Sequence, residues 1–126
     1  MPGKVFDIFA LEHNGRRELL DFLVDLQMSS RREFVKLTRY LDWTKDSGLL
    51  KNEYIFKRLT IDIYEFKTHG GIRILCFVDG RSIVVLTNGF KKKKKYDDEI
   101  SKAANLRLAY LSAKQNDQLM YMEELL

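Results

Sequence analysis

Five consecutive lysines, Lys91 to Lys95, follow a strand-like apolar stretch and form the densest concentration of charge in the sequence. Smaller basic pairs lie at Arg16-Arg17, Arg31-Arg32 and Lys57-Arg58. The formal net charge is +4, so the positive excess is modest overall and unevenly placed. Clustered lysines and arginines attract polyanions. The pattern therefore predicts a surface that handles phosphate, with nucleic acid or an acidic protein segment as its partner.

Arg73 lies inside an apolar, β-branched run, Ile72–Val78, that predicts a well-buried strand. Side chains alternate along a strand, so Ile72, Ile74 and Cys76 should face one side and Arg73, Leu75 and Phe77 the other. A buried arginine requires an anion or a carboxylate as a partner. Glu65 on the neighbouring run offers an internal pair, and a substrate phosphate would fit the planar guanidinium equally.

Two further apolar runs flank the one that carries Arg73, at Ile61–Lys67 and Ile83–Asn88. The connections are His69-Gly70-Gly71 and Asp79-Gly80-Arg81. Residues that tolerate positive φ between strand-like runs are typical of β-hairpins. The sequence therefore predicts a three-stranded antiparallel meander that leads directly into the lysine run.

The segments before and after this meander predict one additional strand and three helices. Lys4–Glu12 alternates loosely, and Leu19, Phe22, Leu23 and Leu26 then recur with a helical period. Ser30 and Glu33 fit a capping box for a second helix that stops at Gly48. Asp97-Asp98 precedes a third helix, and the apolar tail, residues 115–126, is expected to continue as helix. We expect an α+β fold in which an N-terminal helical hairpin packs on a small, mainly antiparallel twisted sheet, with a C-terminal helix.

Composition limits the class of protein. The 126 residues suit a single domain, and no apolar run approaches the ~20 residues that span a bilayer. One cysteine, Cys76, excludes an internal disulfide, and its apolar neighbours predict a buried, unreactive thiol. His13 and His69 alone make a metal site improbable. We therefore expect a cytoplasmic protein with no cofactor, no metal and no membrane contact.

Several motifs occur in a characteristic order: Tyr64-Glu65-Phe66, then Gly71-Ile72-Arg73-Ile74-Leu75, then Gly89-Phe90-Lys91-Lys92 leading into Glu99-Ile100. Together with the two-helix hairpin, they make the sequence similar to the phage-derived HigB-like branch of the RelE/ParE toxin superfamily. The resemblance covers about residues 5 to 112. The chain departs from the usual pattern at Lys93-Lys94-Lys95-Tyr96, where relatives have a short polar segment and a proline, and at Lys67, where relatives more often carry arginine.

This resemblance implies the toxin of a type II toxin–antitoxin pair, a metal-free endoribonuclease that cleaves messenger RNA in the ribosomal A site. Such a reaction needs a base for the 2′-hydroxyl, cations for the phosphorane and an acid for the leaving 5′-oxygen. The candidate catalytic residues are Arg73 as phosphate clamp, together with Lys67, His69, Lys91, Lys92 and Tyr96. The candidate RNA-binding residues are Tyr64, Phe90, Lys93, Lys94 and Lys95.

Several of these candidates also have a structural interpretation that the sequence leaves open. Lys67 and His69 suit a solvated strand end and turn, Tyr64 and Phe90 suit the core, and Tyr96 suits a contact that fixes the third helix. The implied partners are a cognate helix-turn-helix antitoxin, the ribosome and messenger RNA, in a homodimer or a toxin–antitoxin hetero-oligomer. Two alternative functions remain: a noncatalytic nucleic-acid-binding module of the same fold, and a ParE-like toxin that targets a protein.

Overall fold

The structure, a computed structural model, describes the backbone of residues 1–115 and 122–124, and side chains up to residue 115. Its centre is one six-stranded sheet with the strand order β2-β3-β4-β5-β1-β6. Every neighbouring pair is antiparallel except β1 and β5, which run parallel. The strands are β1 (Asp7–Leu11), β2 (Phe56–Arg58), β3 (Tyr64–Lys67), β4 (Ile72–Asp79), β5 (Ile83–Lys91) and β6 (Met122–Glu124).

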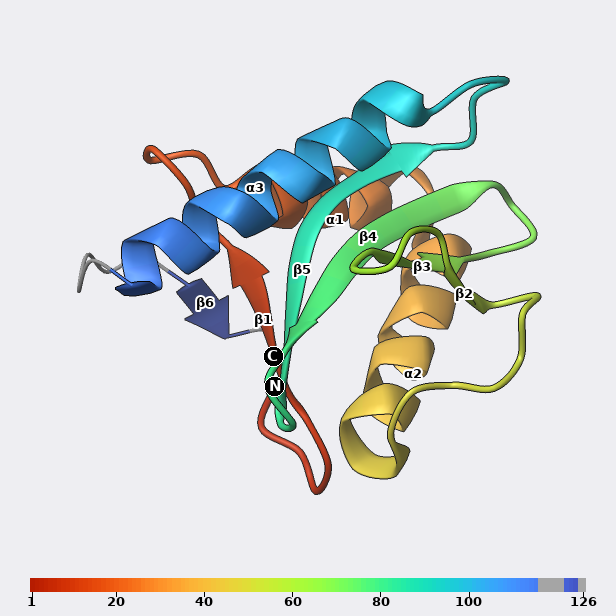
Figure 1. Cartoon of the computed structure of the whole chain (residues 1–126). Helices are drawn as coiled ribbons and strands as arrows, with labels where there is room; N and C mark the ends of the chain where they lie inside the picture. The colour runs from red at the N-terminus through yellow and green to blue at the C-terminus, as the bar shows by residue number, and fades with distance from the viewer. Residues whose placement is uncertain (116–121, 125–126) are drawn as a thin grey trace.

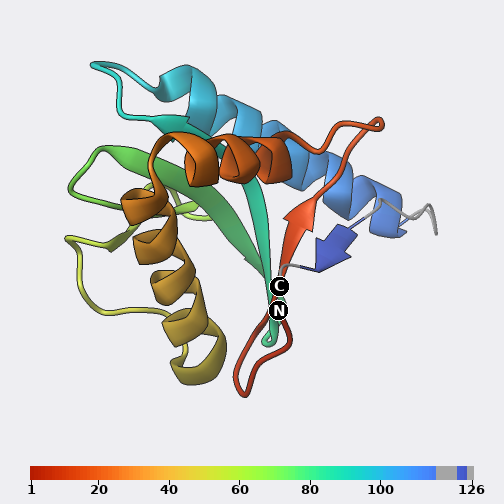
Figure 2. The same cartoon turned by 180° about the vertical axis from the view of Figure 1, so that it is seen from behind.

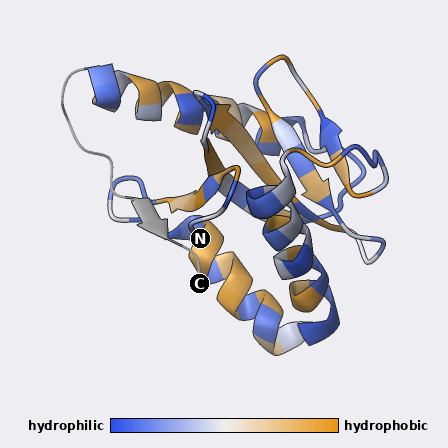
Figure 3. Ribbon diagram, turned by 90° about the horizontal axis from the view of Figure 1, so that it is seen from below, coloured by the Kyte–Doolittle hydropathy of each residue, from blue (hydrophilic) through white to orange (hydrophobic). Residues whose placement is uncertain are grey.

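Within the described part of the chain, three helices cover the two faces of this sheet. The hairpin of α1 (Glu18–Ser29) and α2 (Arg31–Ser47) lies on one face, and α3 (Asp97–Gln115) crosses the other (Figures 1 and 2). Hydrophobic and hydrophilic residues alternate along the helices (Figure 3). In α1 and α2 they fall on opposite sides of the helix, as expected for helices with one buried side. This arrangement confirms the α+β fold class, with its N-terminal helical hairpin, mainly antiparallel sheet and C-terminal helix.

The alternation predicted for β4 divides the core into two clusters. Ile72, Ile74 and Cys76 pack with the hairpin of α1 and α2, whereas Leu75 and Phe77 pack with α3. Burial raises the pKa of the Cys76 thiol, in agreement with the unreactive thiol that the sequence predicts. Arg73 is on the α3 side, because its neighbours in the strand, Ile72 and Ile74, face the other way.

The helical hairpin forms where it was expected, but its predicted capping box is absent. Ser30 stands before α2 without a side-chain cap hydrogen bond, and Gly48 ends the helix with φ of 98°. The Glu33 carboxylate instead points toward the β3–β4 turn, where a Cβ placed on Gly70 would clash with Glu33 Oε1. The capping-box prediction is wrong, because the Ser30 N–H that Glu33 was expected to accept donates instead to the Leu26 carbonyl.

The meander is confirmed, with one strand shorter than predicted. The first strand begins at Tyr64 and not at Ile61, because the preceding residues form a turn in which Thr60 Oγ1 accepts the N–H of Ile63 at 3.1 Å. A short strand that was not predicted, β2, extends the sheet beyond β3. The turn glycines Gly71 and Gly80 have φ of 90° and 66°, as the hairpin signals required.

The C-terminal tail contradicts the expectation of a continuous helix. The helix α3 ends at Gln115, and Met122–Glu124 forms β6, which pairs antiparallel with β1. The remaining tail residues, 116–121 and 125–126, lie outside the described residues. In the part of the chain that the structure describes, no helix combines the length and hydropathy needed to cross a membrane.

Candidate functional site

A small cleft of about 220 Å³ opens beside Arg73, on the α3 side of the sheet where β3 and β4 extend beyond the helix. Its walls come from the end of β3, the start of β4, the turn between them, the residue that follows β5 and the loop before β2. Lys67, Arg73 and Lys92 provide the cations. The other lining residues are Tyr54, Thr68, His69 and Gly71. The cleft therefore combines three positive charges with one histidine and one exposed aromatic ring.

Arg73 is the buried cation of this cleft, with 8% of its surface exposed. Its Nη1 donates to the carbonyl oxygens of Thr68 and Ile72, at 3.3 Å in each case. Its Nε lies 3.9 Å from Glu65 Oε2, and neither of these two atoms has a hydrogen-bond partner among the described residues. The guanidinium is therefore held on one side by backbone carbonyls and near Nε by a carboxylate that is close but not hydrogen-bonded.

Glu65 lies almost completely buried on β3, with 2% of its surface exposed. Burial raises the pKa of this carboxyl above its usual value, although Arg73, Lys67, Lys57 and Lys92 act in the opposite direction. The internal pair with Arg73 that the sequence suggested is thus present at long distance. The pair helps to hold the Arg73 guanidinium in place, and it leaves some of the N–H donors of this group without a hydrogen bond.

An irregularity in β5 decides which lysines reach the cleft. Leu75 pairs with Asn88 but Cys76 pairs with Leu86, so Thr87 is an extra residue in β5. As a result Leu86 faces the helical hairpin, while Phe90 faces α3 and is the cross-strand neighbour of Arg73.

The same register places the next two residues, Lys91 and Lys92, on opposite sides of the sheet. Lys91 pairs with Ile72 and shares its side of the sheet, away from Arg73. Lys92 lines the cleft, and its backbone N–H donates to the Gly71 carbonyl. The two lysines that the sequence treated alike thus lie on different sides, and only Lys92 joins Arg73.

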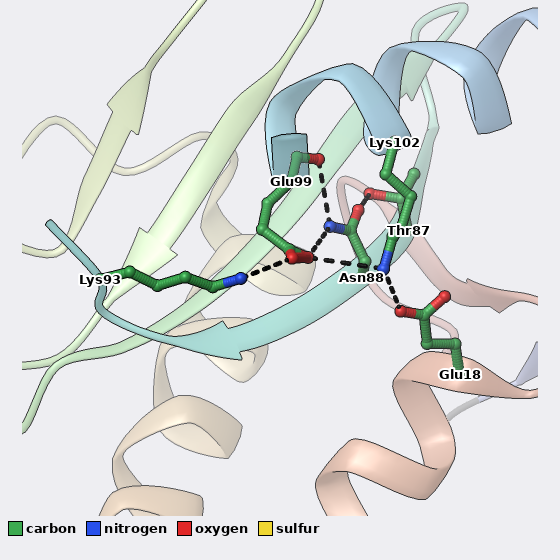
Figure 4. Close-up of polar contacts among 6 residues, drawn as sticks. All are labelled: Glu18, Thr87, Asn88, Lys93, Glu99 and Lys102. Atoms are coloured by element: carbon green, nitrogen blue, oxygen red, sulfur yellow. Dashed lines mark hydrogen bonds and ion pairs between the residues drawn. The ribbon is translucent and has the colours of Figure 1, made fainter. Parts of the chain in front are cut away.

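The side chain of Lys93 interacts with other residues of the protein. Its Nζ lies 3.0 Å from Glu99 Oε2 and 5.7 Å from the centroid of the Phe90 ring. Asn88 Nδ2 donates to both the side chain and the carbonyl of Glu99, at 3.2 Å each. Lys102 lies 3.6 Å from Glu99 and donates to Glu18 of α1 at 2.8 Å, which completes the network in Figure 4.

This network connects the lysine segment, Lys91 to Lys95, to the start of α3. Burial opposes ionisation of Glu99, but hydrogen bonds from Lys93 and Asn88 and the charge of Lys102 outweigh it, so the pKa of the carboxyl is below its usual value. Glu99 thereby anchors β5, the lysine segment and, through Lys102, α1. We infer that the network holds the segment that bears Lys92 in position, so that this lysine lines the cleft.

Tyr96 packs beside the site and does not line the cleft. Its ring lies 5.4 Å from that of Phe90, and its carbonyl accepts the N–H groups of Glu99 and Ile100 at the start of α3. Burial raises the pKa of its phenol, Glu65 adds to this and Arg73 opposes it, so the hydroxyl stays protonated at neutral pH. Tyr96 therefore fixes the third helix and still offers a proton near Arg73 and Glu65.

The remaining predicted residues have varied positions. His69 is exposed on the rim of the cleft, and Lys94 and Lys95 are exposed beyond β5. Phe90 is buried, with 6% of its surface exposed. Tyr64 pairs with Cys76 and stacks on Phe56 at 5.3 Å, so it lies on the side of the helical hairpin, away from Arg73.

Three residues of this region were missed by the sequence analysis. Tyr54 and Thr68 line the cleft, and Lys57 is the cross-strand neighbour of Glu65 on the same side of the sheet. The basic pair Lys57-Arg58 was the signal for the last of these, but its location depended on the strand β2 that was not foreseen. Tyr54 had no signal, because it lies in a loop.

Comparison with known proteins gives one finding at the level of the family. No curated protein matches the chain. The family model described as phage-derived protein Gp49-like (DUF891) matches residues 21–108, which include α2, the meander, the lysine segment and most of α3. The chain therefore belongs to the Gp49-like family of phage-derived proteins.

Proposed function

We propose that this protein is the toxin of a type II toxin–antitoxin pair and acts as a ribosome-dependent messenger RNA endoribonuclease. The observation that carries the proposal is Arg73, which is buried at a cleft whose rim bears Lys67 and Lys92. A fixed guanidinium with two adjacent ammonium groups suits a phosphodiester that gains charge during reaction. Membership in a phage-derived family and the resemblance to HigB-like toxins both support this function.

The reaction requires no group beyond the RNA and the protein. The ribose 2′-oxygen forms a bond to the adjacent phosphorus and gives its proton to a base, while the bond from phosphorus to the 5′-oxygen breaks. The leaving oxygen receives a proton from an acid, so the products are a 2′,3′-cyclic phosphate and a 5′-hydroxyl. The cations stabilise the phosphorane between these steps.

The geometry suggests a role for each residue of the cleft. Arg73 binds the nonbridging oxygens of the scissile phosphate, and Lys67 and Lys92 neutralise the charge from both sides. The proposed base for the 2′-hydroxyl proton is His69 or, in place of its role as a cation, Lys67 in its neutral amine form. Tyr96, whose phenol stays protonated, is the proposed acid for the 5′-oxygen.

The same surface accounts for the proposed partners. A helix-turn-helix antitoxin would inhibit the protein by covering the cations with acidic and apolar side chains, since masking them removes the phosphate site. Lys94 and Lys95, exposed beyond the cleft, would contact ribosomal RNA. Lys93 contributes less to RNA binding in this scheme, because Glu99 already neutralises it.

Analysis of the cleavage products tests the reaction. Purified ribosomes carrying a defined message are incubated with the protein, and the new RNA ends are identified. The proposal expects 2′,3′-cyclic phosphate and 5′-hydroxyl ends. Lys92→Ala should slow cleavage by at least about tenfold, and Lys91→Ala, the matched control on the other side of the sheet, should slow it far less. Equal losses in the two variants would refute the cleft as the site.

A further inference from the structure

Tyr54 is the one aromatic ring that lines the cleft beside Arg73 within the described residues. It is 78% exposed, in contrast to Phe90 and Tyr96, which lie within the cluster beneath α3. Because this ring is largely exposed, it buries little apolar surface and contributes little to the free energy of folding. Its position beside three cations suggests contact with a ligand that carries both phosphate and a flat apolar surface.

The loop that carries Tyr54 is held firmly on both sides. The Tyr54 N–H donates to Asn52 Oδ1 at 3.0 Å, and the N–H groups of Ile55 and Phe56 donate to the Asn52 carbonyl at 3.0 and 2.9 Å. The Ile55 carbonyl in turn accepts the N–H of Lys67 at 2.9 Å. The backbone next to Tyr54 is thus bonded directly to the strand end that supplies a cation to the cleft, so the backbone position from which the ring extends is fixed before a ligand arrives.

We propose that Tyr54 is a stacking platform for one nucleobase next to the phosphate held by Arg73, and so a subsite for single-stranded RNA. The inference rests on the proposed function and adds the form of the substrate. A base stacks on tyrosine only when it is free of its own neighbours, so the subsite selects an unstacked, single-stranded nucleotide. Every base has a π face, and the platform therefore distinguishes strand conformation more than base identity.

Binding of a short oligonucleotide that cannot be cleaved tests the subsite. The probe is a fluorescent 2′-O-methyl RNA hexamer, used intact and with single abasic positions, and its affinity is measured by anisotropy at low ionic strength. Tyr54→Ala should weaken binding of the intact hexamer by roughly five- to a hundredfold, while Tyr54→Phe, which keeps the ring, should change it by less than about twofold. Because the side chain is exposed, both variants should fold like the wild type.

The abasic probes make the test specific for stacking. At one position, loss of the base should weaken binding to the wild type as much as Tyr54→Ala does, and the two changes together should cost no more than either alone. Equal loss on intact and abasic probes at every position, or no loss with Tyr54→Ala, overturns the stacking subsite. A wild type whose binding depends on Arg73 but not on Tyr54 refutes this inference alone. A folded wild type that binds no hexamer also refutes this inference, whereas the proposed function is refuted only if the folded wild type fails to cleave a message on ribosomes.

Discussion

Glu99→Gln is the change that most clearly separates the charge of the network in Figure 4 from its shape. The amide introduced by this substitution keeps an oxygen that can accept from Asn88 Nδ2, but it lacks the charge that attracts Lys93 and Lys102. The two lysine side chains are 50% and 42% exposed, so solvent screens each ion pair to less than about 1 kcal/mol. We expect the free energy of unfolding at neutral pH to fall by about 1–2 kcal/mol.

The pH dependence of this loss follows from the direction of the pKa shift. Because the folded state lowers the pKa of Glu99 below its usual 4.5, the ionised carboxylate stabilises the folded protein at pH values above 4.5. That stabilisation disappears as the pH falls through the lower pKa of the folded state. The stability of wild type and Glu99→Gln should therefore differ at neutral pH and converge in acid.

Urea denaturation followed by circular dichroism at several pH values measures the difference directly. Glu53→Gln serves as the matched control, because Glu53 is an exposed carboxylate in a loop, and its variant should differ from wild type by less than about 0.5 kcal/mol. A Glu99→Gln penalty that stays constant into acid would contradict the reasoning, since the penalty would then arise from packing and not from charge.

Three further experiments, two on substituted proteins and one on the wild type, test other parts of the fold. Gly89→Ala should destabilise the protein by about 1–3 kcal/mol, because the added Cβ would lie 2.5 Å from Phe22 Cδ2; Phe22→Leu in the same chain should recover part of the loss in urea denaturation. Tyr110→Phe removes the hydroxyl that donates to Asp79 at 2.6 Å and should lower stability by about 0.5–1.5 kcal/mol, and an unchanged denaturation midpoint would contradict this. Cys76, buried on β4, should react with a thiol reagent only as fast as the protein opens, so modification as rapid as that of an unfolded control would refute its burial.

The sequence predicted those features that local rules determine. The turn glycines and the alternation around Arg73 placed the meander and assigned Arg73 to the side opposite Ile72, because a period of two and a positive φ are properties of a few adjacent residues. The helical hairpin followed equally from its apolar period. The predicted roles of the individual site residues remain predictions.

Features that depend on long-range register were beyond local rules. The extra residue Thr87 in β5 decides that Lys92 and not Lys91 lines the cleft, and nothing in the apolar pattern of that strand marks it. The strand β2 is only three residues long, and its pairing with β3 brings Lys57 beside Glu65. The β6 strand likewise forms through pairing with the distant β1 and could not be distinguished from a helix by hydrophobicity alone.

The most direct test of the central claim is toeprinting of a defined message on purified ribosomes with variants of Arg73. Because removal of Arg73 alone would leave buried Glu65 without its ion-pair partner, two variants are needed: Arg73→Lys, which keeps the charge, and Arg73→Met with Glu65→Gln, which removes both charges together. The proposed ribonuclease function predicts cleavage in the A site that requires ribosomes, slows by about a hundredfold or more in Arg73→Lys and is absent in the double variant. Cleavage at the wild-type rate by a folded double variant, or no cleavage by the folded wild type, would contradict it.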